Sequence, residues 1–564
     1  MLDRLVKALE HRGPDGQGTV SFRSRTEPGW SISLAHTRLE IVGLGEIGDQ
    51  PKSGADQGGL IFNGEIYGPT AEQSLRQAGI SSDTQWIWEQ LKATARIGPP
   101  KGSDGIWGMV SYDPMDEVIS ISRDPLGVVP VYVYEWSGGL VVASEIQAIA
   151  KAVGSLPINY DELLAAVASR QLSYGRYVDG LSCISPGETR KYGLRNGKVV
   201  CLGSSFEDYF LDYLEGNHRF DTAFDEAIYR QFQADVPLGV QLSGGIDSTL
   251  IAATLAHQGN KGINTFVART NLAGHDEADF AIENARKLGL RKPIEVPIDA
   301  QAFSEEILGS FGNIDPAFSH PNFFAVKKIA RSAREMGIKV LLCGEGADEL
   351  FRGYSRLLPS NLARLVSSSF SEYVQKSVDN RRLNFDQCLP GAAKRAMHAN
   401  GSLHYRWVED PSLRHLFCNY LHELLYRQNI AGMAHSVEVR PPFLDFSVVG
   451  FAMNHPNAFL SCRHGKVDFL KGAVKSRLRD LFPGYTGPSR KSGFSMPLQH
   501  LLNSDAVALL GDSVKFSAEH LGIDRSTCFE RFQKGELSTF EFERNLWPAL
   551  VLGGAVSAAG HSIS

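Results

Sequence analysis

A short loop in the middle of this sequence carries residue types suited to phosphate chemistry. It reads Ser243-Gly244-Gly245-Ile246-Asp247-Ser248, after an apolar run at 236–242 and before a helical pattern at 248–257. The glycines let backbone N–H groups approach a phosphate, and a helix N-terminus favours an anion. Asp247 would repel a bare phosphate, so it fits a ligand for Mg²⁺ bridging phosphates. A plain glycine-rich turn is the simpler reading, but the complete pattern favours a phosphate site. The lysine of a Walker A loop is absent, which argues against γ-phosphoryl transfer.

A second loop repeats this arrangement about 100 residues later. It reads Gly344-Glu345-Gly346-Ala347-Asp348-Glu349, after an apolar run at 338–343. Asp348 could hold the metal and pyrophosphate from the other side, and Glu345 could steer or deprotonate an ammonium nucleophile. The simpler alternative is that these acids stabilise a helix N-terminus. The presence of both loops favours the phosphate interpretation.

The surrounding pattern predicts the elements that position these loops. Ligands of open α/β sheets bind at the carboxyl ends of strands. The expected strands are 236–242, 263–268, 293–297 and 338–343, with helices at 248–257, 276–288 and 322–336. Segments from about 360 to 560 look mostly helical. The first 150 residues instead favour short strands, at 30–34, 59–63, 108–112, 118–123, 130–135 and 140–143. A domain boundary is expected near 200–215.

Composition narrows the function classes. A length of 564 residues predicts two or three domains. The net charge of −6 gives no reason to expect nucleic acid or an anionic membrane as a partner. The N-terminal residues lack an apolar signal region, no run of about 20 apolar residues occurs, and the seven cysteines show no C-x-x-C spacing. We therefore expect a cytoplasmic protein with reduced thiols and no zinc site.

The two loops in this order resemble the synthetase domain of the asparagine synthetase family. Further segments are similar to that family. They are Met-Ala-His-Ser-Val-Glu-Val-Arg at 433–440, Pro-Phe-Leu-Asp at 442–445, Lys-Ser-Gly-Phe at 491–494, His-Arg-Gly-Pro-Asp-Gly at 11–16, Asn-Gly-Glu-Ile-Tyr at 63–67 and Arg-Asp-Pro-Leu-Gly at 123–127. The resemblance covers nearly the whole chain. It implies a class II glutaminase-like αββα sandwich over 1–205. An α/β pyrophosphate-loop synthetase domain, of the adenine nucleotide alpha hydrolase type and with a helical C-terminal part, would follow over 215–564.

The resemblance also implies cofactors and site residues. ATP and Mg²⁺ are the expected cofactors, with Asp247 and Asp348 holding Mg²⁺ and pyrophosphate. Glu345 would act near the nucleophile, and Lys491 would neutralise charge at the adenylate. The nucleotide would further contact Leu242, Ser243, Gly244, Gly245, Ser248, Val267, Gly344 and Gly346. Glutamine would be held by Arg38, Asn63, Gly64, Glu65 and Asp83, with Asn63 and Gly64 forming an oxyanion hole.

Two departures from the family pattern bear on function. The family nucleophile is a cysteine directly after the initiator Met, whereas position 2 here is Leu. The segment before His11 also has no room for the family's first strand. Either the true start lies upstream, or the glutaminase half is inactive and ammonia or an amine supplies nitrogen. In addition, Gln428-Asn429-Ile430 stands where the family often shows an Asp-Arg pair, so substrate contacts or a local ion pair could differ.

The expected function is therefore ATP-dependent amide formation on an aspartate-like carboxylate, releasing AMP and pyrophosphate. The alternatives are an intramolecular amide synthetase of the β-lactam synthetase or lasso-peptide cyclase type, and an amidotransferase of specialised metabolism. An adenylating enzyme acting on tRNA or sulfur and a nucleotide-binding pseudo-enzyme are further alternatives. The acid Glu345 favours an ammonia-using enzyme, whereas the missing cysteine favours the intramolecular type. A homodimer is the family-level expectation for assembly.

Overall fold

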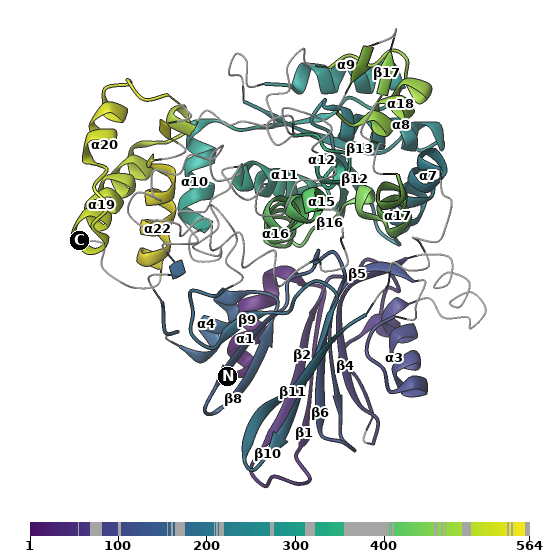
Figure 1. The fold of residues 1–564 in the computed structure, drawn as a ribbon, viewed down its shortest axis with the longest axis vertical. Helices are drawn as coiled ribbons and strands as arrows, with labels where there is room; N and C mark the ends of the chain where they lie inside the picture. The colour runs from purple at the N-terminus through teal and green to yellow at the C-terminus, as the bar shows by residue number, and fades with distance from the viewer. Residues whose placement is uncertain are drawn as a thin grey trace.

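The structure is a computed structural model in which a strand-rich half and a helix-rich half are stacked (Figure 1). It describes residues 1–54, 56–67, 82–99, 103–154, 156–159, 162–163, 175–207, 209, 213, 219–270, 276–310, 322–354, 405, 408, 411–455, 458, 461–463, 466–468, 470–487, 498–538, 541–542 and 545–558. Among these residues, no helix has the length and apolar character needed to cross a membrane.

The N-terminal half contains a six-stranded antiparallel sheet. Its order is β11 (Lys198–Phe206), β10 (Glu188–Arg195), β6 (Val118–Arg123), β5 (Asp104–Asp113), β4 (Gly58–Tyr67) and β3 (Lys52–Gly54). Two smaller sheets lie against it. They are β1 (Gly16–Arg23) with β2 (Ser31–Arg38), and β8 (Gly139–Ala143) with β7 (Tyr132–Trp136) and β9 (Leu181–Cys183). Apolar side chains of both layers, among them Leu34, Val110 and Val133, form one shared cluster. The predicted strand-rich first half is confirmed.

A helix, α1 (Leu2–Leu9), precedes the first strand. Its apolar residues recur at the spacing of one helical face, Leu2, Leu5, Val6 and Leu9. This face packs against α4 (Ile146–Val153) and β2. The residues before His11 therefore form an ordered element that covers one side of the strands.

The C-terminal half is built on a five-stranded parallel sheet. Its order is β14 (Ile294–Pro297), β13 (Asn264–Arg269), β12 (Leu238–Gln241), β15 (Val340–Leu342) and β16 (Glu438–Arg440). The first four strands were predicted from the sequence and are confirmed. The fifth was not predicted as a strand, because two of its three residues, Glu438 and Arg440, are charged.

Helices make up most of the rest of the C-terminal half. They are α7 (Phe220–Gln231), α8 (Ile246–His257), α9 (Ala278–Leu288), α10 (Ala300–Ser310), α11 (Phe323–Glu335), α12 (Ala347–Leu350), α15 (Pro411–Leu416), α16 (His422–Met433), α17 (Phe446–Asn454), α18 (Gly472–Leu481), α19 (Ser504–Leu521), α20 (Ser526–Gln533) and α22 (Trp547–Ala558). The mostly helical later part is confirmed where it is described, apart from β16 and a small hairpin of β17 (Ser461–Arg463) and β18 (Lys466–Asp468). The helix expected at 276–288 begins at Ala278, and the Asp276 carboxylate just before it accepts a hydrogen bond from the Ala278 N–H at 2.9 Å.

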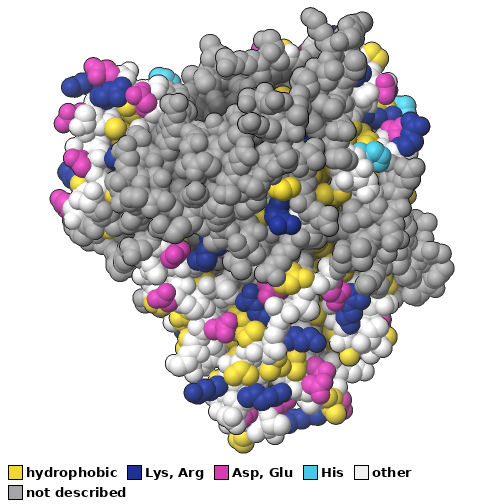
Figure 2. Space-filling view, viewed as in Figure 1, with side chains coloured by type: hydrophobic (Ala, Val, Ile, Leu, Met, Phe, Trp, Pro, Cys, Tyr) yellow, Lys and Arg dark blue, Asp and Glu magenta, His cyan; other side chains and the backbone are white. Residues whose placement is uncertain are grey.

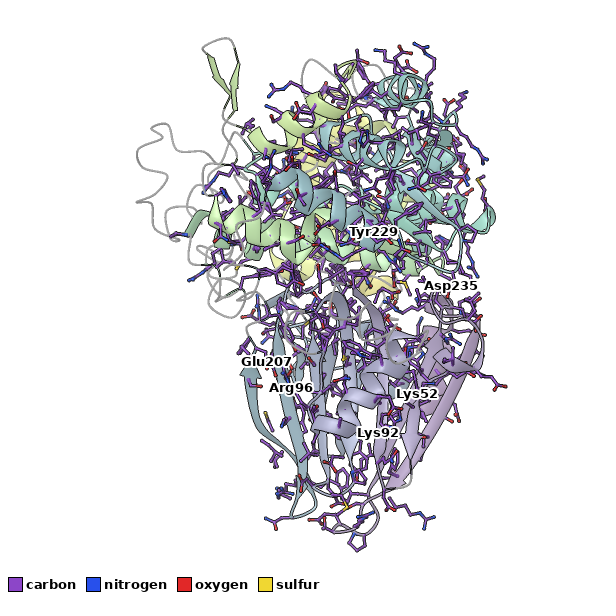
Figure 3. The ribbon with its side chains drawn as sticks, turned by 90° about the vertical axis from the view of Figure 1, so that its right-hand side faces the viewer. Lys52, Lys92, Arg96, Glu207, Tyr229 and Asp235 are labelled. Carbon is purple, nitrogen blue, oxygen red and sulfur yellow. The ribbon has the colours of Figure 1, made fainter. Side chains whose placement is uncertain are left out.

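The two halves meet through polar contacts. Asp235 lies where they join (Figure 3), and its carboxylate accepts a hydrogen bond from the Gly43 N–H at 2.9 Å. A further contact between the halves is the Phe446 N–H, which donates to Asp104 on β5 at 2.8 Å. It adjoins a pair within the C-terminal half, Asp445 with Arg230 at 2.5 Å. Acidic and basic side chains alternate over the visible face of the N-terminal half (Figure 2), so the described residues of that face form no patch of one charge.

Candidate active site

The first loop has the geometry of an anion cradle at a helix N-terminus. It leaves the central strand β12 and opens α8 at Ile246. Gly244 has a φ of +79°, a conformation in which glycine carries no steric penalty. The hydroxyls of Ser243 and Ser248 lie 3.1 Å apart, and the Gly245 N–H approaches the Ser243 hydroxyl at 3.3 Å. Hydroxyl and amide donors therefore converge at the positive end of the helix dipole.

The second loop lies directly against the first. It follows β15, which pairs with β12 in parallel, so both loops leave the same edge of the sheet. A side-chain carbon added at Gly344 would lie 3.0 Å from Cβ of Asp247. Gly346 has a φ of +91° and begins the short helix α12, which carries Asp348. The structure thus brings the two predicted loops together.

A lysine that the sequence analysis did not single out joins the two predicted metal ligands. The ammonium of Lys471 lies 2.6 Å from a carboxylate oxygen of Asp247 and 2.6 Å from one of Asp348. Lys471 is 5% exposed and immediately precedes α18, with its N–H donating to the carbonyl of Phe351 at 2.9 Å. No motif spacing marks this lysine, because its partners lie 224 and 123 positions earlier in the chain.

The acid pair suits a divalent cation only in combination with phosphate oxygens. Two carboxylates converge at this place, and Mg²⁺ commonly binds one or two carboxylates plus substrate phosphates. Within the described part of the chain, no group of three or more His, Cys, Asp and Glu side chains could hold a metal by itself. The residues therefore fit a metal that arrives with a nucleotide.

Glu345 lies beside this cluster and is held by two side chains of α16. Arg427 forms an ion pair with its carboxylate, and the Gln428 amide donates to the same oxygen at 2.9 Å. Gln428 also exchanges hydrogen bonds with the amide of Gln241, the last residue of β12, at 3.1 and 3.3 Å. Gln428 belongs to the segment in which the family often shows an Asp-Arg pair. The ion pair found here instead joins Arg427, one residue earlier, to Glu345.

Three further residues were predicted for the synthetase site, and the structure describes two of them, Leu242 and Val267. Leu242 and Val267 are buried in the core beneath the loops, and the Leu242 N–H donates to the carbonyl of Phe266 at 2.8 Å. Their predicted contacts with a nucleotide stay predictions. Lys491 lies outside the described residues, so its predicted role stays a prediction.

The predicted glutamine-binding residues gather around a cavity of about 150 Å³ in the N-terminal half. Its lining includes Arg38, Asn63, Gly64, Glu65 and Asp83. Asn63 and Gly64 lie on β4, and Gly64 has a φ of +140°. The α1 residues Leu5, Val6 and Leu9 form another part of the wall. All five residues predicted from the resemblance are therefore in one place.

Arg38, however, is already surrounded by acceptors of its own domain. Its guanidinium donates to the carbonyls of Gly43 and Gly45 at 2.6 Å each, and to the carboxylates of Glu40 and Asp49 at 2.9 Å each. A ligand carboxylate would have to compete with these groups. In this structure Arg38 organises the loop after β2.

The acids of the cavity share one buried arginine from the other half of the molecule. Arg440 on β16 is fully buried and donates to Glu65 at 3.0 Å and to Glu438 at 2.7 Å. Burial and the nearby Asp83 carboxylate raise the pKa of Glu65 well above its usual value, and burial raises the pKa of Asp83 to about 6. The cavity is thus an acid-rich site that would accept a proton or a cationic group.

A second link between the halves starts at the cavity wall. Arg12 donates to Glu145 at 2.9 Å and to the Asn429 side chain at 2.9 Å. Burial opposes ionisation of Glu145, but the hydrogen bond from His11 and the charge of Arg12 hold its pKa below the usual value. Asn429 follows directly after Gln428, so α16 connects this wall with Glu345.

Family models match both halves of the chain. The model described as a glutamine amidotransferase domain matches residues 1–192, and the model described as asparagine synthase matches residues 219–558. The second match spans more than half of the chain. The chain belongs to the asparagine synthase family. This family membership makes it a carbon–nitrogen ligase and amidotransferase with small-molecule substrates.

Several members of the asparagine synthase family are similar to this chain over most of its length. Asparagine synthetase [glutamine-hydrolyzing] 1 of Bacillus subtilis is 23% identical, over 98% of this chain and 92% of the relative. A putative asparagine synthetase of Mycobacterium tuberculosis is 26% identical, over 97% and 92%. Asparagine synthetase B of Escherichia coli is 25% identical, over 85% and 75%. Among solved structures, a Bacillus subtilis glutamine phosphoribosylpyrophosphate amidotransferase matches with 14% identity, 66% and 85% coverage and a TM-score of 0.25, too low to support an argument.

Proposed function

We propose that this chain activates a carboxylic acid as its adenylate and then joins nitrogen to it. In the first step, a carboxylate oxygen of the acid bonds to the α-phosphorus of ATP, and pyrophosphate leaves. In the second step, nitrogen bonds to the acyl carbon, AMP leaves with the electrons of the broken C–O bond, and the nitrogen loses a proton. The observation that carries the proposal is the Lys471 ammonium shared by Asp247 and Asp348 beside the two loops.

The first loop would bind pyrophosphate. Ser243, Gly244, Gly245 and Ser248 supply hydroxyl and backbone donors at the N-terminus of α8. Asp247 and Asp348 would hold Mg²⁺, which supplies charge neutralisation for the leaving pyrophosphate. Gly344 allows the second loop to approach the first, since a side-chain carbon there would lie 3.0 Å from Cβ of Asp247. Gly346 adopts the positive φ of +91° that begins α12, the helix that carries Asp348.

Lys471 would stabilise the charge that develops on the phosphates during adenylation. A cation already in place before the reaction needs little reorganisation when charge appears in the transition state. Both carboxylates contact the ammonium at 2.6 Å, so that its position is set before substrate binds. Lys491 is proposed to add a second positive charge at the adenylate, as in the family.

Glu345 would act on the nitrogen nucleophile. Glu345 belongs to the same loop as Asp348. Its carboxylate is oriented by an ion pair with Arg427 and a hydrogen bond from Gln428. Loss of a proton from nitrogen needs an acceptor close to the acyl carbon. We propose aspartate as the acid, by similarity to the relatives, with ammonia as the nitrogen source. The N-terminal half is proposed not to hydrolyse glutamine as the chain stands, since the described lining of its cavity includes no cysteine.

A test follows pyrophosphate release by the whole chain with ATP, Mg²⁺ and aspartate. Ammonium and glutamine are compared as nitrogen sources, with Asp247→Ala as the inactive control. Asparagine formed with ammonium but not with glutamine would support the proposal in full. Release of pyrophosphate without asparagine would support adenylation but contradict ammonia capture, and no release with aspartate would contradict the proposed acid.

One observation favours a second candidate, an intramolecular amide synthetase. The pairing of Glu345 with Arg427 neutralises the carboxylate that would attract an ammonium ion. An amine delivered as part of the adenylated substrate would not need that attraction. A screen of acids that also carry an amine, scored by loss of water from the acid in its mass spectrum, distinguishes this candidate from the first.

A further inference from the structure

A fully buried asparagine on α9 lies among small apolar side chains. Asn284 is 0% exposed, and its buried neighbours on the helix are Ala278, Ala281 and Ala285. A buried amide must find hydrogen-bond partners, because leaving one unmade is costly. Among the described residues, its side chain forms hydrogen bonds with Thr486, 202 positions later in the chain.

The bonds between these two residues involve both backbone groups of Thr486. The Asn284 amide donates to the Thr486 carbonyl at 2.7 Å, and its oxygen accepts from the Thr486 N–H at 3.0 Å and from the hydroxyl at 3.2 Å. One turn further along α9, the ammonium of Lys287 donates to the carbonyl of Gly484 at 3.1 Å. Residues 482–487, which we call the strap, are therefore fastened to α9 on both sides of Tyr485.

Tyr485 reaches from the strap to the first loop. Its hydroxyl donates to the carbonyl of Gly244 at 3.3 Å. Its ring packs against the same apolar core as Phe482, whose ring centre is 6.5 Å away. On its other side, Gly244 lies against α9, since a side-chain carbon there would approach the Ala281 nitrogen to 2.9 Å. Helix α9 thus contacts the loop directly at Gly244. Through the strap it also holds Tyr485, which donates to the Gly244 carbonyl.

Holding this carbonyl has a consequence for phosphate binding. The carbonyl of Gly244 and the N–H of Gly245 belong to one planar peptide unit and point in opposite directions. A hydrogen bond that fixes the carbonyl therefore fixes the direction of the N–H. In this structure the Gly245 N–H donates to the Ser243 hydroxyl at 3.3 Å, so the direction of this peptide also sets where that hydroxyl lies in the loop that would bind pyrophosphate.

We propose that Tyr485 is a positioning residue that orients the Gly244–Gly245 peptide for ATP, and that Asn284 holds Tyr485 in place through the strap. The inference deepens the proposed adenylation and rests on it. Tyr485 acts through the loop backbone. The expected loss on removing its hydroxyl is that of one neutral hydrogen bond, about 2- to 10-fold in nucleotide affinity.

The test measures binding of Mg²⁺ and α,β-methylene-ATP to the full chain by isothermal titration calorimetry, which needs no turnover. Tyr485→Phe removes only the hydroxyl, and Tyr112→Phe removes a buried hydroxyl of the N-terminal half as the matched control. We expect Tyr485→Phe to raise Kd about 2- to 10-fold with an unchanged melting temperature, and Tyr112→Phe to leave Kd unchanged. Equal Kd values for Tyr485→Phe and the wild type would overturn the inference.

A double substitution tests the role of Asn284. If Asn284 acts through Tyr485, Asn284→Ala combined with Tyr485→Phe should raise Kd no more than the larger single effect. Additive effects would show that the two residues act separately and would contradict the proposed strap. A wild-type chain that binds no nucleotide would instead contradict the proposed function, so the two failures are distinguishable.

Discussion

The ammonium of Lys471 and the carboxylate of Asp348 lie 2.6 Å apart, although α12 and the start of α18 are separated by more than 100 residues. The same ammonium is equally close to Asp247. Removing one partner of a buried, hydrogen-bonded charge cluster leaves the others uncompensated. This relationship therefore fixes how the two loops face each other and predicts a large effect of changing the lysine.

We predict that Lys471→Met lowers the rate of adenylation by about 100-fold or more, because a preorganised positive charge facing the phosphates is lost. Lys471→Arg should retain part of the rate, since charge is kept while its position changes. Pyrophosphate release provides the measurement. Lys475→Met, one turn further along α18, is the control. A Lys471→Met enzyme with the wild-type rate would contradict the role given to this lysine.

Glu345→Gln should separate the two half-reactions. The amide retains the shape of the side chain but cannot accept a proton, so capture of nitrogen should fall about 100-fold or more. Exchange of labelled pyrophosphate into ATP, which reports adenylation alone, should stay within about threefold of the wild type. Equal losses in both assays would show that Glu345 serves the first step instead.

Protonation of Asp83 predicts a pH dependence of stability in the N-terminal half. Burial raises its pKa from 3.8 to about 6, so in this range the folded state binds more protons than the unfolded state. The free energy of unfolding should therefore fall as the pH rises through this window. Asp83→Asn should remove the fall and gain on the order of 2 kcal/mol relative to the wild type between pH 4.5 and 7. Urea unfolding of the wild type and of Asp83→Asn at both pH values provides the measurement, with the exposed Asp116→Asn as control. If the free energy of unfolding changes equally with pH in the wild type and in Asp83→Asn, the prediction is wrong.

The domain boundary offers a contrast between two buried acids. Asp445 accepts from Arg230 at 2.5 and 3.1 Å, whereas burial and the charge of Asp445 raise the pKa of Asp104 well above its usual value. Asp445→Asn leaves a buried guanidinium poorly paired and should cost about 3–5 kcal/mol. Asp104→Asn replaces an acid whose pKa is raised with an amide of the same shape, and should cost less than Asp445→Asn. Thermal unfolding of both variants provides the measurement, and a larger loss of stability for Asp104→Asn than for Asp445→Asn would contradict the prediction.

Local patterns were sufficient for the elements that carry the loops. The strands before Ser243 and Gly344 are short apolar runs. Helices α8 and α9 each show a helical spacing of apolar residues within 12 positions, so residues near one another in the chain are enough to predict these elements. Strand β16 was missed because two of its three residues, Glu438 and Arg440, are charged, whereas β15 of the same length lies in an apolar run. It pairs with β15, about 100 positions earlier. This pairing joins residues far apart in the chain, so the local spacing of apolar residues does not indicate it.

By itself, the sequence determined that two glycine-rich loops follow neighbouring buried strands and that their acids suit phosphate chemistry. Only the tertiary structure decided how the charges are matched. It placed Lys471 between Asp247 and Asp348, Arg427 on Glu345 and Arg440 on Glu65, and it surrounded Arg38 with acceptors of its own loop. The physical reason is that a backbone loop is shaped by adjacent residues, whereas a buried charge is balanced by whichever side chain the folded chain brings near it.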